Sequence, residues 1–244
     1  MAIFERDFRI NYEDVDCNNN LTARNLIKFM QEIGGEHSSS VGYGLENLLK
    51  INMAWIILNW NLKIFKSPHT DDIIKIKTWV RSFDKIYCFR DFEIFDEQNN
   101  LIAIASAKWV LKNHASKSIV RISPEIIKAY DCVDKRVFEN DFESKVDVPE
   151  NVDSYYEYVV QRRDIDTNNH VNNLYYIDFA YEALPYEVYN SCDLNNIQVF
   201  YKKEIKYREK IVFCYSFVND DHVVAIKNED LTKVHAVIKI SKKN

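Results

Sequence analysis

The sequence contains no long apolar run and few cysteines. No stretch approaches the roughly 18 consecutive apolar residues of a transmembrane helix, so no membrane span is expected. The first residues lack a basic stretch followed by an apolar one, so no secretory signal is predicted. The five cysteines are scattered and odd in number, which favours reduced thiols in a cytoplasmic protein over a disulfide framework; they are Cys17, Cys88, Cys132, Cys192 and Cys214.

The sequence also lacks an excess of positive charge. Its 32 lysines and arginines and 37 acidic residues give a net charge of −5. General nucleic-acid binding needs a basic surface, so that class of protein is excluded. The 47% hydrophobic content, in contrast, is enough to fill a substantial core, as a folded chain of one large or two modest domains requires.

Several motifs of catalysis and metal binding are missing. No Gly-x-Ser-x-Gly occurs, which excludes the serine hydrolases of the α/β type. The segment 164–175 begins like a calcium loop, but Asn169 and Tyr175 stand where that loop needs Gly and Glu. Five further histidines show no metal-ligand spacing; they are His37, His69, His114, His222 and His235. We therefore expect neither a metal nor another cofactor.

The sequence does contain an internal repeat of one short polar segment. Residues 14–20 read Asp-Val-Asp-Cys-Asn-Asn-Asn, and residues 164–170 read Asp-Ile-Asp-Thr-Asn-Asn-His. Around them, seven of 24 positions are identical when 9–32 is aligned without gaps on 159–182. A fixed-offset repeat indicates repeated architecture, so we expect two tandem domains, 1–132 and 151–244, joined by a charged linker over 133–150.

Each half predicts a strand, the loop, a helix and then consecutive antiparallel strands, which is an α+β pattern. In the first half the helix covers Leu26–Ile33, and the pair Gly34-Gly35 is expected to end or interrupt it. In the second half Pro185 is expected to stop the helix. The expected strands are Trp55–Phe65, Ile73–Arg81, Ile86–Phe95 and Leu101–Leu111, then Ile197–Tyr207, Ile211–Val218, His222–Lys227 and Val234–Ile240.

The second copy of the loop is more specific than the first. Residues 166–173 read Asp-Thr-Asn-Asn-His-Val-Asn-Asn, and residues 201–204 read Tyr-Lys-Lys-Glu. Together with the degenerate first half, these segments resemble the acyl-acyl carrier protein thioesterases of fatty acid biosynthesis. The resemblance implies two tandem hotdog domains, each a long central helix wrapped by an antiparallel sheet. It further implies that the second domain is catalytic and that the first shapes the acyl-chain pocket.

By residue, the resemblance implies catalytic roles for Asp166, Asn168, His170 and Glu204. Thioester hydrolysis needs an activated water, and either His170 or Glu204 can take its proton. Asn168 can hold the water or the carbonyl, and Asp166 can orient its neighbours, attack directly or activate water. Amide groups at the start of the following helix could face the thioester oxygen. A nucleophilic cysteine has been placed directly after the acidic residue in some plant members; Ile205 excludes it here.

Two other interpretations of the function remain open. An acyl-CoA thioesterase of the same fold is one, and a non-catalytic acyl-thioester sensing module is the other. Alternation along the expected strand also allows Glu204 to lie on a solvated face, paired with Lys202 and Lys206. The first loop, with Asn20 in place of His170, favours plain turn and cap chemistry.

The expected partner is an acyl carrier protein carrying a fatty acyl chain, and the protein is expected as a monomer or a homodimer. Acyl carrier proteins are strongly acidic, so their docking site should be locally basic. Arg162-Arg163 lies next to the second loop, and the segment 202–210 holds five basic residues. These two segments are therefore the candidates for docking.

Overall fold

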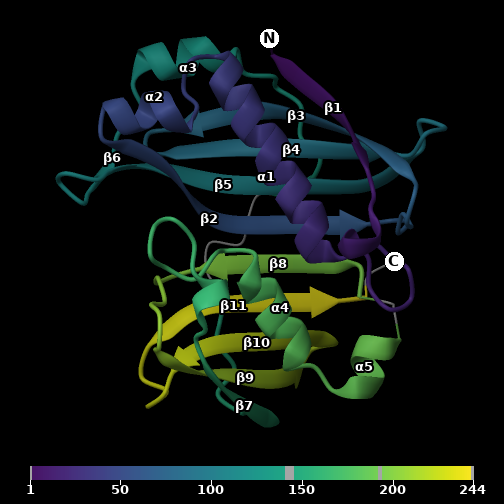
Figure 1. Cartoon of the computed structure of the whole chain (residues 1–244). Helices are drawn as coiled ribbons and strands as arrows, with labels where there is room; N and C mark the ends of the chain where they lie inside the picture. Colours follow the sequence, from purple (N-terminus) through teal and green to yellow (C-terminus); the bar gives the residue numbers. More distant parts are fainter. Residues whose placement is uncertain (1, 141–145, 192–193, 243–244) are drawn as a thin grey trace. The chain divides into compact units, whose positions relative to one another are not determined.

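A computed structural model describes residues 2–140, 146–191 and 194–242. The chain divides into two compact units, Met1–Asp141 and Phe142–Asn244. In each unit a helix lies across one face of an antiparallel sheet (Figure 1), so the α+β prediction is confirmed. Four of the cysteines are free, and Cys192 lies outside the described residues.

The first unit is built on the sheet order β1-β3-β4-β5-β2, with β6 paired to β5. Its strands follow the four expected runs, with ends shifted by a few residues. The elements are β1 (Ile3–Arg9), α1 (Ala23–Ser40), α2 (Leu45–Lys50), β2 (Met53–Ile64), β3 (Ile73–Asp84), β4 (Tyr87–Phe95), β5 (Leu101–Asn113), β6 (Ile119–Val120) and α3 (Pro124–Tyr130). A single turn of 3-10 helix, Tyr12–Asp14, precedes the repeated loop.

Helix α1 forms because its first turn is capped and one face is buried. Thr22 Oγ1 accepts a hydrogen bond from the amide of Asn25 at 3.2 Å, which satisfies one amide at the helix start. Apolar side chains at helical spacing then face the sheet, and the most buried of them are Leu26, Ile27, Met30 and Ile33. The helix crosses the strands at the centre of this unit (Figure 1).

The prediction that Gly34-Gly35 ends or interrupts this helix is wrong, since α1 runs without a break from Ala23 to Ser40. Each glycine costs about 1 kcal/mol of helix propensity, but the following turn buries His37 completely and Ser38 almost completely. Nη1 of the buried Arg90 lies 2.9 Å from Nδ1 of His37, and the Arg90 side chain packs on Gly34. Tertiary burial therefore outweighs propensity here.

The second unit has the sheet order β8-β11-β10-β9-β7 and a shorter helix. Its elements are β7 (Ser154–Val159), α4 (Tyr175–Glu182), α5 (Tyr186–Asn190), β8 (Asn196–Tyr201), β9 (Lys210–Val218), β10 (Asp221–Asn228) and β11 (Val234–Ser241). A 3-10 turn, Arg162–Asp164, again precedes the repeated loop. Helix α4 ends before Pro185, as expected.

Strand β8 is shorter than predicted, and this matters for the site. It ends at Tyr201, and residues 202–209 form a loop before β9. The amides of Lys202 and Lys203 both donate to the carbonyl oxygen of His235, at 2.8 and 3.0 Å, so the regular ladder stops there. Glu204 therefore lies on a loop and not on a strand face, which the alternation of the sequence could not indicate.

The segment expected as a linker contacts both units at its ends. The carbonyl of Lys135 accepts a hydrogen bond from Trp79 Nε1 at 3.0 Å, and its Nζ lies 2.6 Å from Glu93 in the first unit. Val146 and Val148 pack into apolar clusters of the second unit. Residues 141–145 lie outside the described part of the chain.

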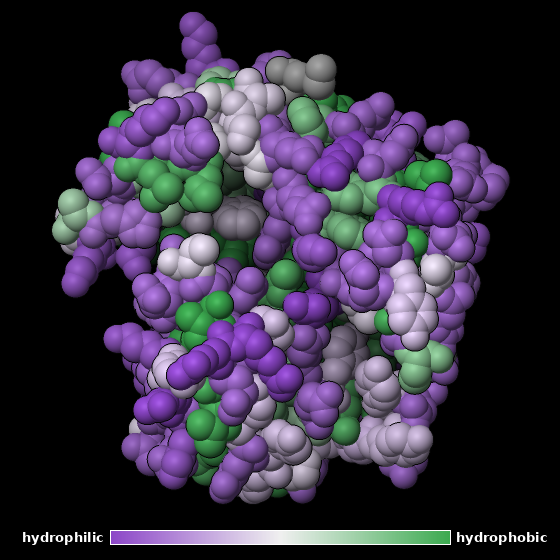
Figure 2. Space-filling model, viewed as in Figure 1, coloured by the Kyte–Doolittle hydropathy of each residue, from purple (hydrophilic) through white to green (hydrophobic). Residues whose placement is uncertain are grey.

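Hydrophilic side chains predominate on the face of the molecule drawn in Figure 2, as the charged composition leads one to expect. Among the described residues, no helix combines the length and the apolar character that crossing a membrane needs.

Candidate active site

The second copy of the loop, residues 164–170, is a tight turn organised by Asp166. Its backbone amide donates to the carbonyl of His170 at 2.9 Å, and its own carbonyl accepts from Asn169 at 3.1 Å. Oδ1 of Asp166 accepts from the backbone amide of Asn168 at 2.8 Å, while the Asn168 side-chain amide lies 3.4 Å from Oδ2. Asn169 adopts the left-handed conformation, with φ 62°, which asparagine tolerates. The turn thus fixes the backbone at His170.

The first copy folds in the same way. The amide of Asp16 donates to the carbonyl of Asn20 at 2.9 Å, and Oδ1 of Asp16 accepts from the amide of Asn18 at 2.9 Å. Asn19 repeats the left-handed conformation with φ 64°. The repeat seen in the sequence is therefore a repeat of structure, down to individual hydrogen bonds.

A buried carboxylate supports the second loop from behind. Asp164 is 1% exposed, and its Oδ2 accepts from the amide of Gln161 at 2.7 Å and from the Tyr158 hydroxyl at 2.8 Å. Its carbonyl accepts from the amide of Asn172 at 2.8 Å, so it links the start and the end of the turn. Burial, followed by the nearby Asp164 carboxylate, raises the pKa of Tyr158, which keeps this donor protonated.

The structure brings His170 and Glu204 together. Nε2 of His170 lies 3.1 Å from Oε2 of Glu204, and the two side chains are 27% and 53% exposed. Both groups are within reach of solvent, so water and a substrate can approach the pair. The arrangement is a histidine held by a carboxylate, a geometry that suits acid–base chemistry.

Two contacts hold the His170 and Glu204 segments in register. The amide of Val171 donates to the carbonyl of Ile205 at 2.9 Å. The hydroxyl of Tyr201 donates to the carbonyl of Asn173 at 2.9 Å, and burial raises the pKa of Tyr201, so it stays a donor. The residue after His170 is thus tied to the residue after Glu204.

Asp166 and Asn168 lie in the same turn as His170, but the Asp166 carboxylate contacts Asn168. The carboxylate of Asp166 accepts from Asn168 and contributes to the turn. The side chain of Asn168 is exposed. The four predicted residues therefore occupy one part of the second unit, and the contact between an imidazole and a carboxylate joins His170 and Glu204.

Helix α4 begins later than expected, at Tyr175 and not directly after His170. Most amides between the two are already used: those of Val171 and Asn172 donate to carbonyls, and those of Leu174 and Tyr175 donate to the side chain and the carbonyl of Asn172. Within the described part of the chain, the amide of Asn173 has no such acceptor. Of the amides of residues 171–175, it is therefore the one that can serve an incoming carbonyl oxygen.

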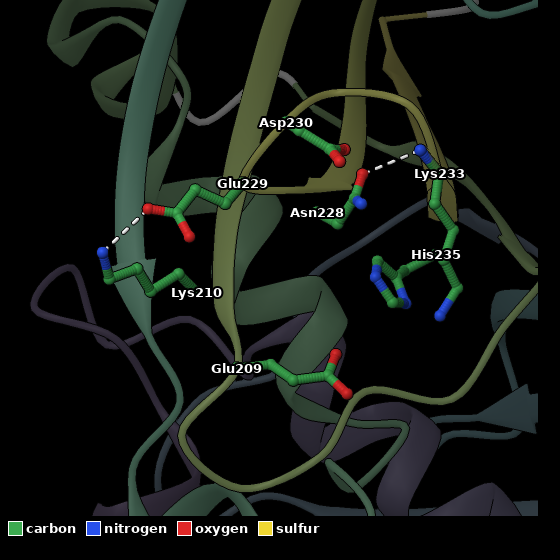
Figure 3. A pocket seen from close by; sticks show the side chains of 7 residues that line it. All are labelled: Glu209, Lys210, Asn228, Glu229, Asp230, Lys233 and His235. Atoms are coloured by element: carbon green, nitrogen blue, oxygen red, sulfur yellow. Dashed lines mark hydrogen bonds and ion pairs between the residues drawn. The ribbon is translucent and has the colours of Figure 1, made fainter.

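A pocket of about 450 Å³ lies in the second unit beside the loop that carries Glu204 (Figure 3). It is lined by Glu209, Lys210, Asn228, Glu229, Asp230, Lys233 and His235. The lining is polar and contains none of the four predicted site residues, so we do not assign the acyl chain to it. It does contain His235, for which the sequence offered no signal beyond a lone histidine in a strand.

The first unit has no acid–base pair at the corresponding place. The amide of Leu21 donates to the carbonyl of Pro68 at 2.8 Å, just as Val171 donates to Ile205, so Ser67 occupies the place of Glu204. Asn20 occupies the place of His170.

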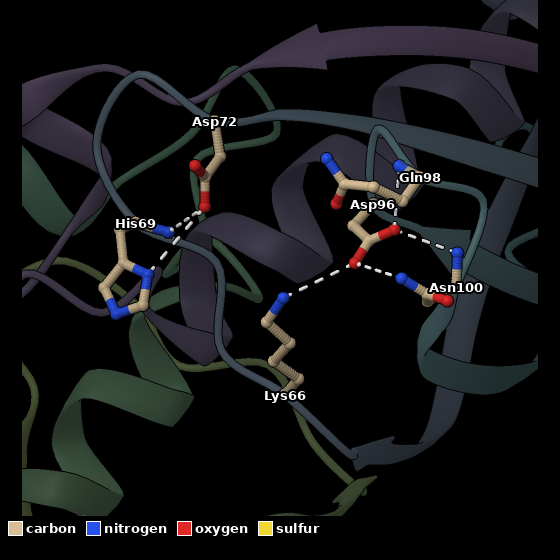
Figure 4. A network of polar contacts seen from close by, with 6 residues as sticks. All are labelled: Lys66, His69, Asp72, Asp96, Gln98 and Asn100. Atoms are coloured by element: carbon tan, nitrogen blue, oxygen red, sulfur yellow. Dashed lines mark hydrogen bonds and ion pairs between the residues drawn. The ribbon is translucent and has the colours of Figure 1, made fainter.

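Two surface segments of the first unit, residues 65–72 and 96–100, are held by other polar contacts (Figure 4). Lys66 Nζ lies 3.4 Å from Oδ2 of Asp96, and Oδ2 of Asp72 accepts from the amide of His69 at 2.8 Å. Hydrogen bonds from the Asn100 side chain, ahead of smaller effects, lower the pKa of Asp96. These contacts are those of ordered surface turns.

Comparison with known proteins agrees with this architecture. The family model described as the acyl-ACP thioesterase N-terminal domain matches residues 1–130, and the model of the C-terminal domain matches residues 148–242. The chloroplastic oleoyl-acyl carrier protein thioesterase of Coriandrum sativum is 25% identical over 97% of this chain. The match covers 65% of that relative, so the chain spans less than two thirds of its length.

Solved structures extend the comparison to the fold. An acyl-ACP thioesterase from Bacteroides thetaiotaomicron superposes with a TM-score of 0.89 and 22% identity, covering 98% of this chain and 97% of the other. The 12:0-ACP thioesterase from Umbellularia californica has a TM-score of 0.86 and 18% identity, covering 99% and 97%. These likenesses confirm the tandem hotdog fold. With both family models matched, the chain belongs to the acyl-ACP thioesterase family.

Proposed function

We propose that the protein hydrolyses the thioester of fatty acyl-acyl carrier protein, releases the free fatty acid and so ends chain elongation. The observation that carries the proposal is the 3.1 Å contact between Nε2 of His170 and Oε2 of Glu204. It stands in a turn with the family's motif residues, in a chain matched by both family models. A module that only senses acyl thioesters has no need of such a pair.

The contact suggests how water is activated. If Nε2–H of His170 donates to Glu204, Nδ1 of the neutral ring is left with a lone pair and can take a proton from water. The Glu204 carboxylate then stabilises the imidazolium, as the aspartate carboxylate does beside the histidine of a catalytic triad. His170 is thus our candidate base, and Glu204 the group that orients it.

The remaining steps require a hydrogen-bond donor that stabilises the negative charge on the carbonyl oxygen. The water oxygen attacks the thioester carbonyl carbon, and its proton passes to Nδ1 of His170. The carbonyl oxygen becomes an oxyanion, to which the amide of Asn173 is the candidate donor. Collapse breaks the carbon–sulfur bond, and the leaving thiolate takes the proton from His170. Loss of one such donor typically costs about 10²- to 10³-fold in rate.

Asp166 and Asn168 support this arrangement in different ways. Asp166 accepts the Asn168 amide at 2.8 Å and donates its own amide to the carbonyl of His170 at 2.9 Å. We assign it to shaping the turn rather than to attack on the substrate. The exposed side-chain amide of Asn168 can hold the water or the thioester.

The carrier and the location are part of the proposal. Arg162, Lys206 and Arg208 are exposed near the site, which supports docking of an acidic carrier protein. We assign the acyl chain to the first unit on the family resemblance. A cytoplasmic location is supported by four free cysteines, and the assembly state stays a prediction of monomer or homodimer.

The test is fatty acid release by the purified chain from acyl carrier protein substrates and from the matching acyl-CoA substrates, over several chain lengths. We expect release from both carriers, with the larger kcat/KM on the carrier protein. Preference for acyl-CoA would favour the acyl-CoA thioesterase, and tight binding of acyl carrier protein without release would favour the sensing module. Either result would contradict the proposal.

A further inference from the structure

The backbone carbonyl of Glu204 is held by a buried imidazole. Nδ1 of His235, on β11, lies 3.2 Å from this carbonyl oxygen and 3.3 Å from that of Lys203. Carbonyl oxygens only accept hydrogen bonds, so Nδ1 must carry the proton and donate to both. His235 is fully buried. The same residue also accepts two amides of this segment through its own carbonyl.

The first unit shows that the fold does not require this imidazole. There the amides of Phe65 and Lys66 both donate to the carbonyl of Ile102, at 2.8 and 3.2 Å. This repeats the double contact of Lys202 and Lys203 with His235. The same backbone geometry is thus built with isoleucine in the unit that has Ser67 in place of Glu204.

The imidazole also places a polar nitrogen atom at a buried position. Its Nε2 is buried and has no hydrogen-bond partner within the described residues. Figure 3 shows its ring among the residues that line the polar pocket, with Glu209 and Lys233. A buried polar atom without a partner costs free energy, whereas an isoleucine side chain would not. What the histidine adds at this position, compared with isoleucine, is the Nδ1 contact with the Glu204 loop.

We propose that His235 is a positioning residue that fixes the Glu204 loop so that the carboxylate stays against His170. This inference rests on the proposed function. The loop has φ 65° at Arg208 and no regular ladder over 202–209, so the backbone at Glu204 depends on local contacts. Nδ1–H of His235 supplies such a contact directly at Glu204. A displacement of the order of 1 Å in a catalytic group can cost about 10²-fold in rate.

The test compares His235→Ile with His222→Ile. Isoleucine is the residue that the first unit uses at this place. His222 is the control because it lies on the neighbouring strand β10 and its Nδ1 contacts the Tyr215 hydroxyl at 2.9 Å, away from Glu204. We expect His235→Ile to lower kcat about 10- to 100-fold with KM changed less than about threefold. His222→Ile should keep the wild-type kcat.

Rescue separates positioning from packing. In His235→Asn the side-chain amide nitrogen can stand near the place of Nδ1 and donate again, so kcat should return to within about threefold to tenfold of wild type. In a Glu204→Gln background, His235→Ile should have little further effect on kcat, because residues that act through one another are not additive. Imidazole ¹⁵N resonances of His170 should move in His235→Ile and not in His222→Ile.

Each contrary outcome has a separate meaning. Wild-type kcat in folded His235→Ile, no recovery in His235→Asn, or a full additional loss in the Glu204→Gln background would overturn the positioning role alone. Wild-type activity in Glu204→Gln would instead overturn the acid–base pair on which it rests. The His170 resonances give a readout that does not depend on turnover.

Discussion

Nε2 of His170 lies 3.1 Å from Oε2 of Glu204, although the two residues belong to different segments of the second unit. The contact depends on the hydrogen bond from the Val171 amide to the Ile205 carbonyl and on the hydrogen bond that the Tyr201 hydroxyl donates. Together they align the turn of His170 with the loop of Glu204. In the first unit the same backbone bond, from Leu21 to Pro68, aligns Asn20 with Ser67 instead. The scaffold is therefore shared, and the two units differ in the side chains that it aligns.

Restoring a histidine to the first loop should not create a second site. In a His170→Ala background, Asn20→His should leave the rate of fatty acid release at the level of His170→Ala alone, because Ser67 stands where a carboxylate is needed. The measurement is kcat on an acyl carrier protein substrate. A recovery of more than about tenfold would show that the first unit retains a working site.

The paired aspartates separate turn formation from catalysis. Asp16→Ala and Asp166→Ala each remove the carboxylate that accepts an amide two residues later, at 2.9 and 2.8 Å. We expect each to lower the free energy of unfolding by about 0.5 to 1.5 kcal/mol in urea denaturation. Only Asp166→Ala should also lower kcat. An equal loss of activity in Asp16→Ala would contradict the division of labour between the loops.

Burial of His235 predicts how stability depends on pH. Burial lowers its pKa below the ordinary 6.5, more than the Lys203 carbonyl raises it, and Lys233 lowers it further. Below pH 6.5 the unfolded chain therefore binds a proton that the folded chain resists, so stability is lost as the pH falls.

The variant His235→Ile should lose less unfolding free energy than wild type between about pH 7.5 and pH 5, because it lacks this group. His222→Ile is a useful comparison, since burial lowers the pKa of His222 as well. Parallel urea-denaturation series at the two pH values give the measurement. Identical losses in wild type and His235→Ile would contradict a neutral, buried ring.

Charge reversal tests the docking surface. Arg162→Glu and Lys206→Glu should lower kcat/KM about tenfold on acyl carrier protein substrates and leave a small thioester unaffected, because the proposed surface would steer an acidic partner. The loss should shrink at high salt. Lys50→Glu, on an exposed helix of the first unit, is the control. Unchanged kcat/KM on the carrier substrate would exclude these residues from docking.

Much of the fold could be predicted because local patterns and tertiary contacts agree. The repeated loop, the alternating strands and the stop at Pro185 are all visible in the residues themselves. The course of α1 through Gly34 was not, because it depends on the burial of His37 and Arg90, which lie far apart in sequence.

The site was predictable to a lesser degree. Asp166, Asn168, His170 and Glu204 were found by resemblance, and the structure places them in one part of the second unit. The end of β8 at Tyr201 was missed because one carbonyl, that of His235, takes two amides. His235 itself could not be predicted, because it stands out only when it is compared with Ile102, the residue at the same place in the first unit. That correspondence follows from the backbone hydrogen bonds of the two units and not from the sequence.

The most direct test is the rate of fatty acid release from acyl carrier protein by His170→Ala. The variant should keep the wild-type circular dichroism spectrum, because the His170 side chain is partly exposed and contacts Glu204, whose side chain is itself half-exposed. We predict that kcat falls by about 10²- to 10⁴-fold, the usual contribution of a general base. A folded His170→Ala protein with wild-type kcat would contradict the account.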